Sequence, residues 1–188
     1  SLGGFAIFAS ISMVLLTLSN FEINAYSQYF LGGMLIIFLI GLKDDILVID
    51  PYKKLLGQIA AASLVVFLGD MHFTNLHGFL GIYQIDPLLG AILTVFVIIV
   101  ITNSFNLIDG IDGLAAGIGI LAAAVLSLWF FYVGQQQLAI IAVTITGAYL
   151  GFFLFNVSRG KNKIFMGDSG SLILGFALKD TLSNFASG

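Results

Sequence analysis

The sequence has no cysteine and few charged residues, and each shortage excludes a class of protein. Without cysteine, the chain has neither a disulfide framework nor a thiolate-bound metal. Charged residues make up only 9% of the chain and hydrophobic residues 59%, so it cannot be an ordinary water-soluble domain. The net charge of −3 is too small to indicate a nucleic-acid partner. With a mean hydropathy of +1.08, the composition predicts an integral membrane protein.

The sequence also starts without a methionine and without a basic segment ahead of its first apolar run. Because a secretory signal peptide carries such a basic segment, this run is expected to be a membrane helix rather than a signal peptide. We expect residues 1–188 to form a single integral membrane domain and to be a fragment of a longer protein.

Long apolar runs recur along the chain, and about 20 apolar residues are enough for a helix to cross a bilayer. The runs show no alternation of polar and apolar residues, which argues against a membrane β-barrel. The sequence therefore predicts an all-α, polytopic transmembrane helix bundle with about six to seven membrane helices. The predicted spans, followed by an incomplete seventh from Ser171, are Phe5–Ser19, Tyr29–Leu42, Leu56–Leu68, Leu88–Phe105, Leu114–Val133 and Leu138–Phe155.

Charged residues lie mostly in the connections between these spans. If the spans alternate in direction, Lys43–Lys54, Asn106–Gly113 and Asn156–Asp168 share one face, which holds six of the seven Lys and Arg residues. Basic residues accumulate on the cytoplasmic side of membrane proteins, so this face is predicted to be cytoplasmic. The connections of the opposite face hold no Lys or Arg: Asn20–Gln28, Asp70–Asp86 and Gly134–Gln137.

Aspartates gather on the same predicted face, although acidic residues contribute little to membrane orientation. Asp44 and Asp45 are adjacent near the end of a predicted helix, and the repulsion between them favours a cation as their partner. This face offers carboxylates and amides but neither histidine nor cysteine, so Mg²⁺ or Mn²⁺ fits better than zinc.

A second polar cluster lies where the predicted fourth helix leaves the membrane. Its members recur at every third position and are Asn103, Asn106, Asp109 and Asp112. Such a stripe can face one cavity, and Gly110 and Gly113 allow close approach by a ligand. The helix expected from Leu114 would offer free N–H groups to a phosphate. A plain Asn/Asp/Gly turn with a capping aspartate is the simpler alternative.

A third cluster, Phe165-Met-Gly-Asp168-Ser-Gly170-Ser171, leads into the last apolar run. Asp168 is either a helix N-cap or a metal ligand. Phe165 is either an anchor at the membrane interface or a flat surface for a base.

These motifs, in this order and on one face, resemble those of the polyprenyl-phosphate N-acetylhexosamine-1-phosphate transferases, glycosyltransferase family 4, which include the phospho-MurNAc-pentapeptide translocases. The start of the chain, Ser1–Phe8, resembles the end of the family's first cytoplasmic loop. The four motifs that carry most of the resemblance are Gly41-Leu-Lys-Asp44-Asp45, Lys54-Leu-Leu-Gly57-Gln58, Asn103–Gly113 and Phe165–Ser171.

The resemblance implies an enzyme that transfers N-acetylhexosamine-1-phosphate, with GlcNAc-1-phosphate expected, from a UDP-sugar to undecaprenyl phosphate. UMP would be released and a lipid-linked cell-envelope glycan, such as O-antigen, begun. The implied cofactor is Mg²⁺, with Mn²⁺ as an alternative. The implied location is the bacterial cytoplasmic membrane, crossed several times, with the active face cytoplasmic. The expected partners are the two substrates and the lipid bilayer, and a homodimer is left open.

The resemblance also implies roles for single residues. Asp168 resembles the principal Mg²⁺ ligand, with Asp44 and Asn106 as further ligands. Asp44 and Asp45 would bind metal or accept a proton from the lipid phosphate, and Asp109 and Asp112 would lie around the diphosphate. Those four aspartates form the implied catalytic set. The implied substrate-binding residues are Lys53, Lys54, Asn103, Asn106 and Phe165.

Two features depart from the family, which usually has a helix ahead of this start, further C-terminal helices and a histidine-rich cytoplasmic loop. The two histidines here, His72 and His77, are predicted on the opposite face. An ion-coupled transporter is the alternative function, with the clustered aspartates binding Na⁺ or H⁺, but its acids would lie near the midplane of the bilayer. An intramembrane aspartyl protease would need two aspartates facing each other within helices.

Overall fold

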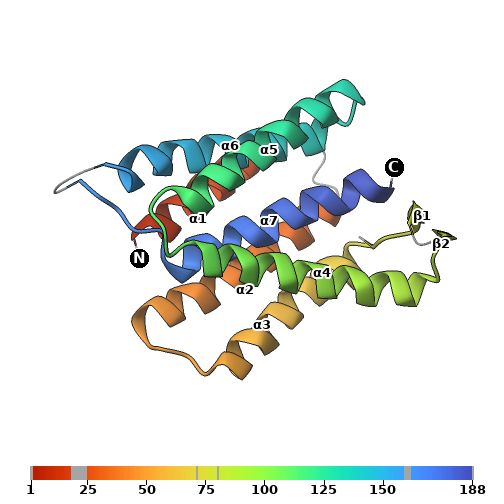
Figure 1. Ribbon diagram of the computed structural model, residues 1–188, viewed down its shortest axis with the longest axis horizontal. Helices are drawn as coiled ribbons and strands as arrows, with labels where there is room; N and C mark the ends of the chain where they lie inside the picture. The colour runs from red at the N-terminus through yellow and green to blue at the C-terminus, as the bar shows by residue number, and fades with distance from the viewer. Residues whose placement is uncertain (1, 18–24, 71, 80, 159–161, 188) are drawn as a thin grey trace.

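The computed structural model describes residues 2–17, 25–70, 72–79, 81–158 and 162–187, and most of them are helical (Figure 1). The predicted all-α helix bundle is therefore confirmed. The α-helices are α1 Leu2–Thr17, α2 Ala25–Ile46, α3 Pro51–Ser63, α4 Pro87–Ile108, α5 Leu114–Tyr132, α6 Gln136–Asn156 and α7 Gly167–Ser187. The remaining elements are a π-helical turn, η1 Leu64–Leu68, and two strands, β1 Asn75–Phe79 and β2 Ile82–Gln84.

Two of the helices begin at an aspartate followed by a proline. Asp50 and Asp86 each accept a hydrogen bond from the backbone N–H two residues on, at 2.9 and 3.0 Å. Pro51 and Pro87 then occupy the first turn, where a missing N–H costs nothing. These caps fix where α3 and α4 enter the bundle.

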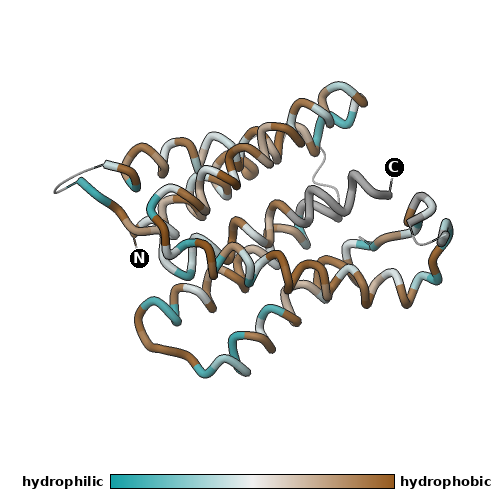
Figure 2. The backbone as a smooth tube through the Cα atoms, in the orientation of Figure 1, coloured by the Kyte–Doolittle hydropathy of each residue, from teal (hydrophilic) through white to brown (hydrophobic). Residues whose placement is uncertain are grey.

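The surface of the bundle is apolar, as a bilayer requires. Among the described residues, α4, α5 and α6 are long and apolar enough to cross a membrane, and α1 is a shorter apolar helix. Large side chains such as Phe96, Leu128 and Leu154 point outward and are 61%, 72% and 69% exposed. The hydrophobic colour of Figure 2 follows the bodies of the helices, and the hydrophilic colour gathers at their connections.

The last helix, α7, lies at the centre of the bundle and contacts α1, α2, α4, α5 and α6. Its side chains from Leu172 to Leu174 are fully buried, as are Phe176 and Ala177. The stretch 172–178 is apolar on all sides, as expected of a helical segment in a core position. The seventh apolar run predicted from Ser171 belongs to α7, which begins four residues earlier at Gly167 and has 21 residues.

The connections lie at two opposite ends of the bundle, as the predicted alternation requires. One end, called here the charged end, carries the α2–α3, α4–α5 and α6–α7 connections, at the left of Figure 1. The other end carries the strands and the α5–α6 turn. The α1–α2 connection, 18–24, lies outside the described residues.

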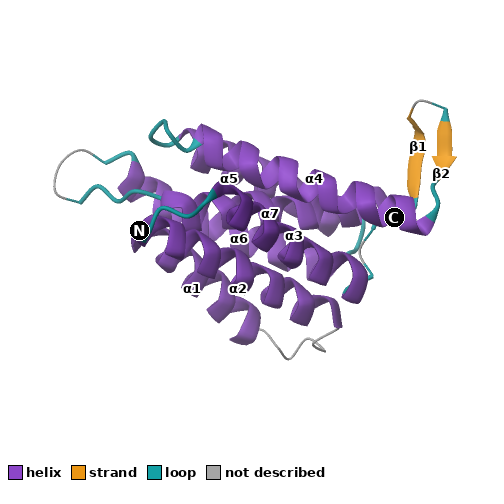
Figure 3. Ribbon diagram, turned by 90° about the horizontal axis from the view of Figure 1, so that it is seen from below, coloured by secondary structure: helices purple, strands orange, loops and turns teal. Residues whose placement is uncertain are grey.

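The strands form a small hairpin that the sequence did not predict, and it extends beyond the N-terminal end of α4 (Figure 3). β1 pairs with β2 in antiparallel fashion, and Gly81 in the turn adopts a φ of +78°. The backbone N–H of Phe73 donates to Thr94 Oγ1 at 3.0 Å and ties the hairpin to α4. His72 lies 3.5 Å from Asp70 at this end. The side chain of His77 lies outside the description.

Candidate active site

Four polar side chains from four different helices meet at the charged end. They are Asp44 of α2, Lys54 of α3, Asn106 of α4 and Asp168 of α7, and we call them the Lys54 cluster. The Lys54 ammonium lies 2.7 Å from Asp44 Oδ2 and 3.2 Å from Asp168 Oδ2, and it donates to Asn106 Oδ1 at 3.4 Å. Two carboxylates share one ammonium, so the cluster has an excess of negative charge that a further cation would neutralise.

Local structure holds Asp44 and Lys54 in place. The Asp44 Oδ1 atom accepts the backbone N–H of Ile49 at 2.9 Å, so one carboxylate bonds both to the α2–α3 turn and to Lys54. Lys54 lies in the first turn of α3, where its backbone N–H donates to the Asp50 carbonyl at 3.1 Å. The short connection between α2 and α3 therefore places an acid and a base opposite each other.

Asn106 joins α4 to α7. Its Nδ2 donates to Asp168 Oδ1 and, at 3.0 Å, to Ser171 Oγ. Its Oδ1 accepts from Lys54. Both ends of the amide are therefore used, and the side chain has one defined orientation.

Asp45 has a different environment from its neighbour Asp44. Its carboxylate accepts the backbone N–H groups of Asp168 at 2.8 Å and Ser169 at 3.4 Å, and the Ser169 hydroxyl at 2.7 Å. It therefore caps the N-terminus of α7 from another helix, where free N–H groups favour a negative charge. Gly41 allows this approach, since a Cβ there would collide with the backbone of Ser169. Only Asp44 of the pair enters the Lys54 cluster.

Two other residues of the implied substrate-binding set lie apart from the Lys54 cluster. Asn103 is one turn further into the bundle and exchanges two hydrogen bonds with Gln58, at 2.7 and 3.3 Å. It also donates to the Ile99 carbonyl at 2.8 Å. The side chain of Lys53 is exposed on α3. In the described part of the chain, no hydrogen bond or ion pair links Lys53 to the cluster.

Asp109 directly follows α4 and is partly buried. Burial, and after it the negative charges of Asp168, Asp45 and Asp112, together raise the pKa of its carboxyl to about 6. Asp109 therefore lies within the electrostatic field of the Lys54 cluster and adds to its negative charge.

A second group, called here the Lys163 cluster, lies closer to solvent and consists of Asp112, Lys163 and Phe165. Lys163 forms an ion pair with Asp112, and its ammonium lies 5.0 Å from the centre of the Phe165 ring. The Phe165 side chain is 63% exposed, so much of its ring is open to a ligand. The cluster joins the connection before α5 to the connection before α7.

The oxygen atoms around Lys54 are those that a hard cation prefers. Among the described residues, no three His, Cys, Asp or Glu side chains are grouped closely enough to form a metal site by themselves. Asp44, Asp168 and Asn106 nevertheless direct two carboxylates and one amide oxygen at a single ammonium. Mg²⁺ typically uses one or two carboxylates and completes its shell with water and phosphate oxygens. The donor set therefore fits Mg²⁺ held jointly with a phosphate ligand.

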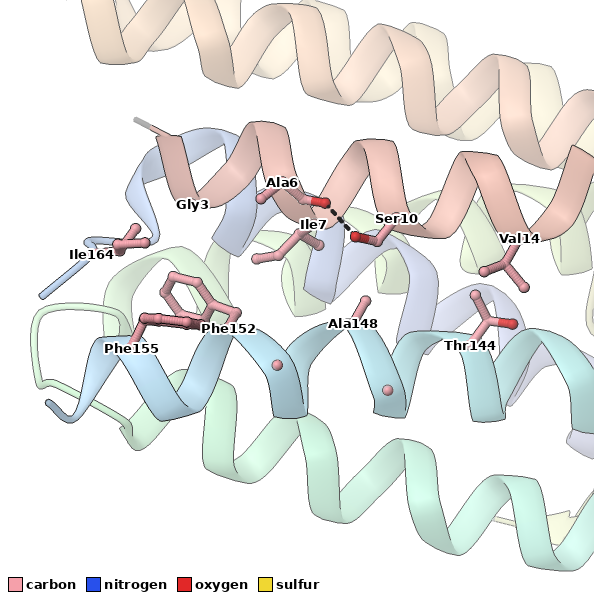
Figure 4. Close-up of a pocket in the computed structure, with 12 residues that line it drawn as sticks. Gly3, Ala6, Ile7, Ser10, Val14, Thr144, Ala148, Phe152, Phe155 and Ile164 are labelled. Atoms are coloured by element: carbon pink, nitrogen blue, oxygen red, sulfur yellow. Dashed lines mark hydrogen bonds between the residues drawn. The ribbon is translucent and has the colours of Figure 1, made fainter. Parts of the chain in front are cut away.

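A cavity of about 400 Å³ lies between α1 and α6, and none of the residues that line it belongs to either lysine cluster. Figure 4 shows the two helices facing each other across it, with Ile7 on α1 and Phe152 on α6. The Ser10 hydroxyl at its edge donates to the Ala6 carbonyl at 2.7 Å. None of its lining residues carries a charge, so it offers no phosphate-binding group.

The structure gives roles to residues to which the sequence analysis assigned none. Ser169 and Ser171 hold the start of α7, and Gln58 binds Asn103. The spacing of Lys54 and Gln58 places them on the same face of a helix, and this was an available signal. Asn156 links two connections of the charged end, and only its polarity at the end of an apolar run distinguishes it in the sequence.

Comparison with known proteins agrees with this geometry. Residues 27–182 match the family model described as Glycosyl transferase family 4. The chain is 39% identical over 160 residues to the decaprenyl-phosphate N-acetylglucosaminephosphotransferase of Mycolicibacterium smegmatis, covering 78% of this chain and 38% of the relative. It is 31% identical over 178 residues to the probable undecaprenyl-phosphate N-acetylglucosaminyl 1-phosphate transferase of Bacillus subtilis, covering 94% and 49%.

A third relative is the phospho-N-acetylmuramoyl-pentapeptide-transferase of Staphylococcus carnosus, 31% identical over 191 residues, with 93% of this chain and 59% of the relative covered. The chain spans about half the length of the curated relatives it matches. The match to the family model covers most of the chain, including all three aspartate motifs at the charged end. The chain belongs to glycosyl transferase family 4.

Proposed function

We propose that this protein transfers N-acetylhexosamine-1-phosphate, with GlcNAc-1-phosphate the expected group, from a UDP-sugar to undecaprenyl phosphate. The observation that carries the proposal is the Lys54 cluster, which combines two carboxylates, an amide and an ammonium at one end of an apolar helix bundle. A lipid acceptor and a water-soluble donor need a site of this kind at a membrane boundary. Two of the relatives named above are polyprenyl-phosphate transferases of an N-acetylglucosamine phosphate by name.

The reaction joins two polyanions. An oxygen of the lipid phosphate attacks the phosphorus attached to the sugar, the bond from that phosphorus to the bridging oxygen breaks, and UMP leaves with that oxygen. A phosphate monoester has a second pKa of about 6, so the attacking oxygen is already largely deprotonated at pH 7. Proton abstraction therefore matters less than charge neutralisation and alignment.

The Lys54 cluster supplies that neutralisation and alignment. Lys54 brings a positive charge that Asp44, Asp168 and Asn106 orient before substrate arrives. Asp168, Asp44 and Asn106 would hold Mg²⁺, which neutralises phosphate charge when bound, and Mn²⁺ is the alternative metal. Asp45 keeps Asp168 in place through the backbone of α7.

The Lys163 cluster is assigned to the nucleotide. The exposed ring of Phe165 offers a stacking surface for uracil, and Lys163 and Asp112 lie beside it. Asp109 lies between Asn106 of the Lys54 cluster and Asp112 of the Lys163 cluster in the sequence, and the charges of Asp168 and Asp112 both raise the pKa of its carboxyl. This position suits a place near the diphosphate.

We assign the charged end to the cytoplasmic side of a bacterial cytoplasmic membrane. Lys43, Lys53, Lys54 and Lys163 belong to this end, and Arg159 and Lys161 lie outside the described residues. The excess of basic residues supports the assignment. The aspartates of the two clusters, with Asp45 and Asp109, lie at this end rather than at the middle of the bundle, which gives no support to the alternative of an ion-coupled transporter.

N-acetylglucosamine is favoured over a muramoyl pentapeptide. The described connections at the charged end are short, with Leu47–Asp50 between α2 and α3 and Asp109–Gly113 between α4 and α5. Short connections offer little surface for a peptide. The relatives with 39% identity over at least 152 residues act on an N-acetylglucosamine phosphate by name, which supports the same choice.

The test is release of UMP by the purified full protein, given undecaprenyl phosphate, Mg²⁺ and each of a panel of UDP-sugars. We expect UMP with UDP-GlcNAc, and only when the lipid phosphate is present. Folded protein that releases no UMP with any sugar in the panel would contradict the proposal.

A further inference from the structure

Asn156, the last residue of α6, bonds to two connections of the charged end at once. Its Oδ1 accepts the backbone N–H of Gly113 at 2.6 Å, and its Nδ2 donates to the backbone carbonyl of Ile164 at 3.0 Å. The residue is 4% exposed. A side-chain amide carries an acceptor and a donor, so it can link an N–H to a carbonyl, which a carboxylate or a hydrocarbon of the same size cannot.

The two partners are next to the Lys163 cluster in the chain. Gly113 follows Asp112, and Ile164 lies between Lys163 and Phe165. Gly113 adopts a φ of +77°, and the Asp112–Gly113 backbone lies close to the end of α6, since a Cβ on Gly113 would be 2.7 Å from Val157 Cγ1. Asn156 therefore fixes the backbone on both sides of the cluster without belonging to it.

We propose that Asn156 is a positioning residue for the nucleotide sugar. By holding Gly113 and Ile164 at a fixed separation, it sets the distance between the connection that carries Asp112 and the connection that carries Lys163 and Phe165. It acts through these residues rather than on the substrate, because it is buried and both of its polar ends are engaged. The inference rests on the proposed function, which places a UDP-sugar at this cluster.

The ion pair between Lys163 and Asp112 also joins the two connections, but more weakly. The side chains are 30% and 50% exposed, and ion pairs at such positions contribute little to stability. Asn156 is therefore the main link, and the ion pair partly replaces it when Asn156 is changed.

The test measures kcat and KM for UMP release by the full protein carrying Asn156→Asp or Asn156→Ala. The Asp variant keeps an acceptor for Gly113 but directs a second oxygen at the Ile164 carbonyl. We expect KM for UDP-GlcNAc to rise about ten- to a hundredfold, as a displaced binding group would cause. KM for undecaprenyl phosphate should stay within about twofold, because the Lys54 cluster does not bond to Asn156.

Ser158→Ala is the matched control, since Ser158 lies two residues after Asn156 and its hydroxyl donates to the Phe155 carbonyl of α6 at 2.9 Å, away from Gly113 and Ile164. It should leave both KM values unchanged. In the double variant Asn156→Ala with Lys163→Met, KM for UDP-GlcNAc should rise at least about threefold beyond the product of the single effects, because both links join the same connections.

Three results would overturn the inference. One is an active Asn156→Asp or Asn156→Ala protein with reduced thermal stability and unchanged KM for UDP-GlcNAc, which would give Asn156 a purely structural role. A second is loss of folded protein in both variants, which would show that Asn156 holds the bundle rather than the two connections. A third is an equal rise in both KM values. Absence of UMP from the unaltered protein would instead show failure of the proposed function.

Discussion

The Lys54 and Lys163 clusters contain the same kinds of groups, an ammonium and neighbouring carboxylates, in different surroundings. Lys54 and Asp44 are 15% and 11% exposed, and the Lys54 cluster joins four helices. Lys163 and Asp112 are 30% and 50% exposed and join two connections. The same pair of residue types is therefore tightly held in the Lys54 cluster and less constrained in the Lys163 cluster.

Burial and the number of partners explain the difference. Removing one partner of a buried ion pair leaves an uncompensated charge, which is costly, whereas an exposed pair contributes little. The Lys54 ammonium has three oxygen partners, so it is oriented before any substrate binds. Lys163 has Asp112 and an aromatic face, both partly open to solvent, so it can move toward a ligand.

The largest effect is expected from Asp168→Asn, which removes a charge from the Lys54 cluster and leaves its shape intact. We expect UMP release to fall by at least about 100-fold while the protein remains folded in the membrane. Asp50→Asn is the matched control at the same end, because asparagine caps a helix as well as aspartate does. Activity retained within about tenfold in Asp168→Asn would remove Asp168 from the reacting centre.

The next effect separates Asp44 from Asp45. Asp44→Asn removes a carboxylate from Lys54, so activity should fall about 100-fold and the Mg²⁺ concentration for half-maximal activity should rise. Asp45→Asn weakens the cap of α7, so activity should fall only about tenfold and the Mg²⁺ requirement should stay the same. A magnesium titration of UMP release checks both. Equal shifts in the two variants would contradict separate roles.

This pair also shows what the sequence could predict. The motif Gly41–Asp45 placed two acids at a helix end on the charged face, which the structure confirms. Successive residues on a helix point about 100° apart, so the two carboxylates need not have the same partners. Which of them faced Lys54 depended on the rotation of α2 against α7, and packing of the whole bundle sets that rotation. The sequence therefore left their roles open.

The connections were predicted less well than the helices. Apolar runs and polar breaks placed the spans near their observed positions, because the bilayer fixes the length of a helix. The hairpin of β1 and β2 was missed because its strands have only 5 and 3 residues, too few to show a period. Asn156 was missed because its partners are backbone groups 43 and 8 residues away. Those contacts exist only once the helices have assembled.

A third effect concerns stability rather than activity. The pKa of Asp109 is about 6 in the folded protein, above its ordinary value of 3.8, so the folded state binds this proton more tightly than the unfolded state. The stabilisation of the fold by this bound proton is therefore lost as the pH rises through 6, and the charged carboxylate then destabilises the fold. We expect Asp109→Asn to raise the midpoint of thermal unfolding in EDTA at pH 7 and to have little effect at pH 4. A lower midpoint at pH 7 would contradict this.

The smallest effect is expected from Lys163→Met, which keeps an apolar stem against Phe165 and removes the charge. KM for UDP-GlcNAc should rise about threefold and kcat should stay nearly constant, because an exposed pair contributes about 1 kcal/mol or less. Lys163→Arg keeps the charge and should leave both values unchanged. Steady-state kinetics of UMP release distinguishes the cases. A loss of kcat as large as that of Asp168→Asn would mean that the two clusters act as one centre, since only a group engaged in the transition state lowers kcat to that extent.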